Sequence, residues 1–67
     1  MSDWKIYYRD NLDQDRVSRR IPSKEAALKR ARDLYIHRRA ELYRIEGPNG
    51  HTFTKEAVMR WVSSHRW

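Results

Sequence analysis

The sequence predicts a small two-layer α+β domain, in which an antiparallel sheet is covered on one face by helices in the order ββαββα. Three observations support this fold class. Large apolar residues alternate with polar ones over residues 4–9, residues 24–38 carry an apolar stripe at helical spacing, and two short apolar runs flank the turn formers of residues 47–50. The 67 residues leave room for one domain only.

The first predicted strand covers residues 4–9, whose alternation and aromatic content are typical of a strand with one buried face. A polar stretch rich in turn formers follows. Residues 16–21 can then pair back as a second strand that turns Val17 and Ile21 toward the core. Because Arg19 lies between these two on the same side, the pairing of the second strand stays open.

A helix is predicted over residues 24–38. Ser23 stands at its N-cap position, and Glu25 lies in the first turn, where a negative charge complements the helix dipole. The residues of the apolar stripe are Ala27, Leu28, Ala31, Leu34 and Tyr35. This stripe provides the face that covers the sheet.

The second half of the chain repeats the outline of a hairpin followed by a helix. Residues 41–46 and 51–54 are predicted to pair around residues 47–50, where Asn-Gly adopts positive φ at little cost. Thr54 is then the N-cap of a second helix. The apolar face of that helix includes Ala57, Val58, Trp61 and Val62.

Strict alternation divides the predicted sheet into two faces. Toward the helices lie Trp4, Ile6, Tyr8, Tyr43, Ile45 and Phe53. Leu42 then falls on the other side, so either the register differs or Leu42 belongs to an exposed or dimeric surface. The open face is expected to carry Lys5, Tyr7, Arg9, Arg16, Ser18, Arg20, Arg44 and Glu46.

The charge balance is basic and uneven. Fifteen basic and nine acidic residues give a net charge of +6, and residues 23–40 alone hold six bases and two acids. The absence of cysteine excludes disulfides and thiolate zinc sites. No apolar run reaches the length of a membrane helix, and the N-terminus does not resemble a signal peptide, so we expect a cytoplasmic protein without membrane contact.

No catalytic motif is present. The chain contains no Gly-rich phosphate loop, HExxH motif or nucleophile elbow, and its three histidines lack the close spacing of metal ligands. We therefore expect a protein that is not an enzyme and that uses no metal, cofactor or small-molecule substrate.

Two binding functions are consistent with the surface. The first is contact with DNA or RNA through a basic surface with one aromatic residue, although antiparallel sheets commonly have an ordinary solvated polar face. Its candidate residues are Lys29, Arg30, Arg32, Arg38, Arg39, Arg9, Arg16, Arg20, Arg44 and Tyr7. The alternative is a protein interaction or homodimerisation surface made of Ile36, Leu42, Met59 and Trp67, which have no obvious core role.

Two segments, residues 23–34 and 40–50, resemble short uncharacterised bacterial domains of unknown function. Those domains combine a Trp-bearing first strand, a helix opened by Ser or Thr, and a Gly-containing hairpin. The resemblance covers about residues 4–53 and implies a ββαββ core without implying an activity. The present chain differs by a second helix and its C-terminal Trp67.

Overall fold

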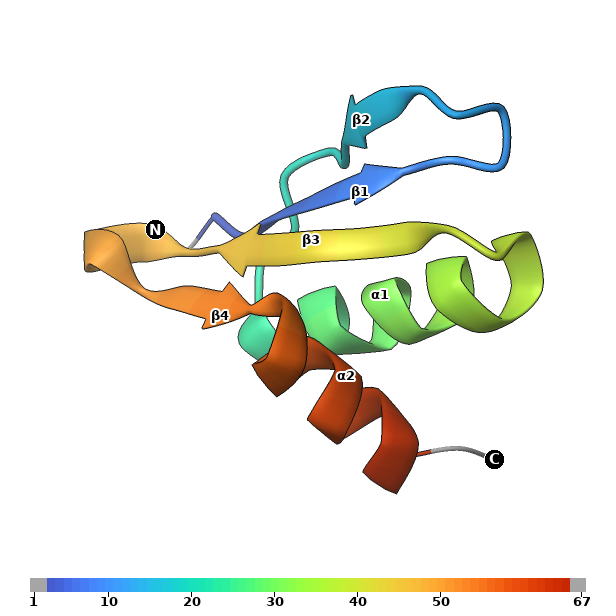
Figure 1. Cartoon of the computed structure of the whole chain (residues 1–67). Coiled ribbons are helices and arrows are strands. Elements are labelled where there is room, and N and C mark those ends of the chain that lie inside the picture. The colour runs from blue at the N-terminus through green and yellow to red at the C-terminus, as the bar shows by residue number, and fades with distance from the viewer. Residues whose placement is uncertain (1–2, 66–67) are drawn as a thin grey trace.

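A computed structural model describes residues 3–65 of the chain (Figure 1). The element order is ββαββα, as predicted. The elements are β1 (Lys5–Arg9), β2 (Asp15–Val17), α1 (Lys24–Arg38), β3 (Glu41–Glu46), the short 3-10 turn η1 (Pro48–Gly50), β4 (Thr52–Thr54) and α2 (Lys55–Ser64).

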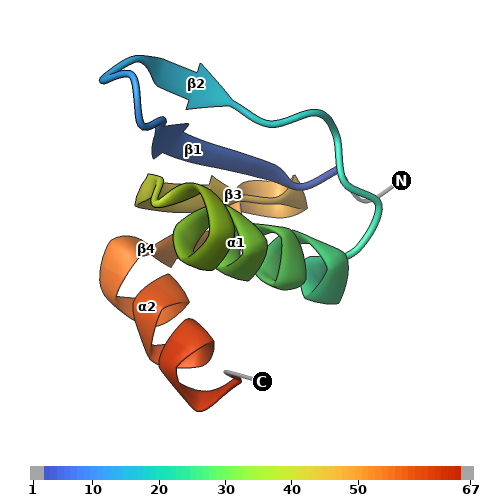
Figure 2. The same ribbon diagram turned by 90° about the vertical axis from the view of Figure 1, so that its right-hand side faces the viewer.

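The four strands form one antiparallel sheet in the order β2-β1-β3-β4. Helix α1 packs against β1 and β3, and α2 packs against β3, β4 and α1. Figure 2 shows α1 in front of β3, while β2 lies at the far edge with no helix in front of it. Among residues 3–65, no helix combines the length and the apolar character needed to cross a membrane.

Local sequence signals set the ends of both helices. The Ser23 hydroxyl accepts a hydrogen bond from the Ala26 amide at 3.1 Å, and the Thr54 hydroxyl accepts one from the Ala57 amide at 3.2 Å. Arg39 ends α1 in the left-handed conformation with φ 51°. The predicted caps are therefore confirmed, because each hydroxyl satisfies an amide that the first helical turn leaves without a partner.

One apolar core joins the sheet to both helices. Its buried residues are Trp4, Ile6, Ala27, Leu28, Ala31, Leu34, Ala40, Leu42, Ile45, Val58 and Val62. The Trp4 ring stacks on Phe53, with ring centroids 5.7 Å apart. Gly47 lies directly against the Trp4 ring, so closely that a Cβ at this position would stand 2.5 Å from the ring atom Cε3.

A bulge in β3 changes which residues face the core. Tyr8 of β1 pairs with Leu42, whereas Tyr7 pairs with Arg44, so Tyr43 is an extra residue in the ladder. Leu42 is consequently 1% exposed. The prediction that Tyr43 faces the core was wrong, because strict alternation does not survive the extra residue. Of the two alternatives for Leu42, the different register is confirmed and the exposed interaction surface is wrong.

A second irregularity lies where β2 leads toward α1. Ser18 bonds to Ile6, and Ile21 exchanges backbone hydrogen bonds of 2.8 and 2.9 Å with Trp4. Between these two paired positions, the segment after β2 has two residues, whereas the segment leading into β1 has only Lys5. The segment after β2 therefore contains one extra residue. The extra residue returns Ile21 to the helix side, where it packs against the core as predicted.

The register of β2 reverses the expected faces of that strand. Arg16 pairs with Tyr8, and Val17 pairs with Tyr7. Because directly paired residues share a face, Arg16 lies on the helix side and Val17 on the open side, where Val17 is 52% exposed. The predicted positions of Arg16 on the open face and Val17 in the core were therefore wrong. The second strand does pair, but only over Asp15–Val17.

Candidate nucleic-acid interface

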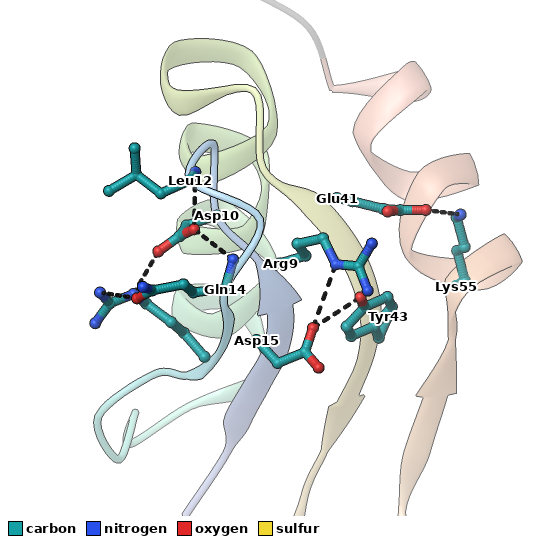
Figure 3. Close-up of polar contacts among 9 residues, drawn as sticks. Arg9, Asp10, Leu12, Gln14, Asp15, Glu41, Tyr43 and Lys55 are labelled. Atoms are coloured by element: carbon teal, nitrogen blue, oxygen red, sulfur yellow. Dashed lines mark hydrogen bonds and ion pairs between the residues drawn. The ribbon is translucent and has the colours of Figure 1, made fainter.

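The open face of the sheet neutralises most of its own charge. Arg9 pairs with Asp15 at 3.4 Å, and Arg44 pairs with Glu46 at 2.7 Å. Glu41, opposite Arg9 in the ladder, pairs with the Lys55 ammonium group at 3.2 Å. Figure 3 shows the pairs made by Asp15 and Glu41. These arginines meet acidic partners within the protein, which lowers their availability to an anionic ligand.

Two tyrosines lie on this face, one more than predicted. The Arg44 guanidinium stands 4.1 Å from the centroid of the Tyr7 ring. Tyr43 donates a hydrogen bond of 2.9 Å to Asp15, and partial burial together with this bond raises the pKa of the Tyr43 hydroxyl. The hydrogen bond from Arg9 to the same carboxylate raises the pKa of Arg9. The aromatic groups of the open face are thus already engaged by neighbouring side chains.

A concave surface lies on the opposite side of the sheet, between β2 and α1. It consists of two adjoining hollows of about 500 and about 310 Å³, and Tyr8 and Leu34 line both. The arginines in their linings are Arg19 and Arg30 in the larger hollow and Arg16 and Arg38 in the smaller. We call the two hollows with these four side chains the arginine groove.

The topology explains why this surface is open. Helix α1 covers β1 and β3, and neither helix of residues 3–65 packs closely over the helix side of the edge strand β2. Ala26 lines the larger hollow with only a methyl group. Arg30 and Arg38 extend into the groove from α1, and Arg19 lines it from the irregular segment after β2.

Among the described residues 3–65, Asp10 is the only acidic one in the linings of the two hollows. Its carboxylate accepts hydrogen bonds of 2.9 Å from the amides of Leu12 and Gln14 (Figure 3). It also forms an ion pair with Arg16. The Gln14 amide, followed by the Arg16 guanidinium, holds the pKa of Asp10 below its usual value. Asp10 therefore stabilises the β1–β2 turn and neutralises the charge of one groove arginine, Arg16.

The remaining groove cations have no acidic partner among residues 3–65. Arg19, Arg30 and Arg38 form no ion pair with any carboxylate of that part of the chain. All three are exposed. Three guanidinium groups thus line one concave surface without an ion-pair partner in the described part of the chain.

The other predicted cations are distributed differently. Arg32 is half-buried against α2, where its guanidinium lies 5.8 Å from the Trp61 ring and donates a 2.8 Å hydrogen bond to the His65 carbonyl. Of the other predicted helix and loop cations, Lys29, Arg39 and Arg20 are exposed and lie outside the linings of the two hollows. Sequence reasoning missed Arg19 as a surface cation, because alternation placed it inward and no local signal marks the extra residue beside it.

The residues of the alternative interaction surface lie mostly in or beside the core. Leu42 is buried, Met59 packs against the core, and Ile36 is half-buried. Trp67 lies outside the described residues. Of the large apolar side chains in residues 3–65, the exposed ones are instead Leu12, at 70%, and Val17.

No family model, curated protein or solved structure matches the chain. Within residues 3–65, no group of three potential ligand residues could hold a metal ion.

Proposed function

We propose that this protein is a non-catalytic nucleic-acid-binding module that holds the phosphate backbone in its arginine groove. The observation that carries the proposal is the placement of Arg16, Arg19, Arg30 and Arg38 around one concave surface whose single acid, Asp10, is already paired. Arginine suits this role, because its planar fork can donate two parallel hydrogen bonds to one phosphate.

The distribution of charge favours the groove over the sheet face. On the sheet face, Arg9 and Arg44 have carboxylate partners, which a phosphate would have to displace. In the groove, Arg19, Arg30 and Arg38 have none among residues 3–65. The net charge of +6 attracts a polyanion to the whole molecule, and the groove supplies its closest contacts.

Fluorescence anisotropy with a short labelled single-stranded oligonucleotide tests this proposal. We expect measurable binding at low salt that weakens steeply as salt rises, since each phosphate contact releases counterions. The double variant Arg30→Gln/Arg38→Gln should bind about tenfold more weakly. Its slope of log affinity against log salt should be shallower by about 0.7 for each contact removed.

The matched control is Lys29→Gln/Arg60→Gln, which removes the same charge from exposed helix positions outside the groove. This control should bind nearly as well as the unmodified protein. Circular dichroism of each variant checks that the fold is intact. Equal losses in the two double variants would overturn the groove as the site, and the absence of binding at low salt would overturn the function.

A further inference from the structure

We infer that the arginine groove is a site for unpaired nucleic acid, in which a nucleobase enters the larger hollow while phosphates contact the arginines around it. This inference rests on the proposed function and narrows its ligand class to single strands. It follows from the apolar groups in the lining of the groove, which phosphate binding alone does not require.

The lining of the larger hollow combines apolar groups with cations. Besides Ser18 and the two arginines, it consists of Tyr8, Val17, Ile21, Ala26 and Leu34. Tyr8 and Ile21 pack against the core but stay partly exposed, so each supports a ligand without having to move out of the protein interior. A surface with an aromatic ring and cations together suits a base with its attached phosphate.

The dimensions of the site are sufficient for a nucleobase. The larger hollow has a volume of about 500 Å³, which lies within the range of small-molecule sites. Arg30 and Arg38 are eight residues apart on α1, which places their Cα atoms about 12 Å apart along the helix axis. This separation leaves room for a base between a phosphate at Arg30 and another at Arg38.

A duplex cannot use these apolar groups. Its bases are paired and stacked inside the helix, so only phosphates and groove edges reach a protein surface. The larger hollow lies between β2 and α1. Helix α1 packs against the sheet and α2, so it does not stand free of the domain as a helix that could enter a major groove (Figure 2). A duplex would therefore contact only the arginines at the rim.

The Ser18 hydroxyl is not available to distinguish one base from another. Ser18 lines the larger hollow, but its hydroxyl accepts a 2.9 Å hydrogen bond from the Ile6 amide and donates one of 3.0 Å to the Arg19 carbonyl. Both of its roles are thus taken within the protein. We expect affinity to come from stacking and charge, with weak dependence on nucleotide order.

Three labelled probes of equal length test the inference: a single strand, its blunt duplex, and an abasic strand that keeps the phosphates but lacks the bases. The abasic strand and the duplex should bind about 5- to 100-fold more weakly than the single strand. This loss of affinity corresponds to the stacking free energy of one base. An oligonucleotide that carries 2-aminopurine should show a fluorescence change on binding as its base stacks.

The variant Ala26→Trp fills the larger hollow and leaves every arginine in place, because Ala26 lines it with a methyl group only. It should bind the intact and the abasic strand equally. Ser63→Trp, at an exposed position of α2, is the matched control and should retain the preference for the intact strand. If Ala26→Trp does not fold by circular dichroism, Ala26→Leu serves as a smaller obstruction with the same expected direction.

The outcomes separate this inference from the proposed function. If the intact and abasic strands bind the unmodified protein equally while Arg30→Gln/Arg38→Gln still weakens binding, the base site is refuted and phosphate binding stands. If a polyglutamate peptide competes as well as an oligonucleotide of equal charge, the site is one for acidic chains in general, and the single-strand inference is refuted. Absence of binding to every probe refutes both proposals.

Discussion

Replacing Leu42 by Ala tests the bulged register of β3. Leu42 is 1% exposed and belongs to the apolar core. The substitution removes three buried carbons at about 0.8 kcal/mol each and leaves a cavity, so it should lower the free energy of unfolding by about 2–5 kcal/mol. A domain of this size has a total free energy of unfolding of about 3–10 kcal/mol. The single change therefore removes a large share of the stability.

The neighbouring variant Tyr43→Thr is the matched comparison. Tyr43 is the extra residue of the bulge and lies on the open face, so its replacement by another β-forming residue should cost about 1 kcal/mol. Urea denaturation followed by circular dichroism measures the free energy of unfolding of both variants. In a thermal melt, each 1 kcal/mol of lost stability lowers Tm by about 4–8 °C. If Leu42→Ala does not fold, the smaller change Leu42→Val replaces it in the test and should lower the free energy of unfolding by about 1 kcal/mol. A larger loss at Tyr43 than at Leu42 would refute the bulged register.

Three further predictions concern single contacts. Gly47→Ala should lower the free energy of unfolding by about 1–3 kcal/mol in a urea titration, because the added methyl group collides with the buried Trp4 ring; an unchanged midpoint would contradict this packing. Asp10 has a lowered pKa in the folded state, so its carboxylate stabilises the fold above about pH 4, and this contribution is lost as the pH falls through the folded pKa. The stability of Asp10→Asn should therefore fall less steeply than that of the unmodified protein in acid, as thermal melts over a pH series would show, and parallel curves would argue against it. Ser23→Ala should cost about 1 kcal/mol in the same melts through the loss of the N-cap of α1, and Ser23→Asp, which keeps a cap acceptor, should restore most of it.

The helices and the order of the elements could be predicted from local signals in the sequence. The expected helix over residues 24–38 has the same bounds as α1, since a cap hydroxyl at Ser23 and a stripe ending near Tyr35 both act within a few residues. The hairpin turn at residues 47–50 was likewise identified by its Asn-Gly pair, and Asn49 and Gly50 do adopt positive φ. These features depend on neighbours in the chain.

The faces of the strands depended on tertiary packing. One extra residue in β3 lets both Leu42 and Ile45 enter the core and turns Tyr43 outward, and one beyond β2 returns Ile21 to the helix side. Alternation has a period of two, so each extra residue reverses every assignment beyond it. Only the fit of these apolar side chains against the helices selects the position of each bulge. The arginine groove exists because that packing also leaves the helix side of β2 uncovered. Which edge strand stays uncovered depends on how the helices pack on the sheet, and no local sequence pattern predicts it.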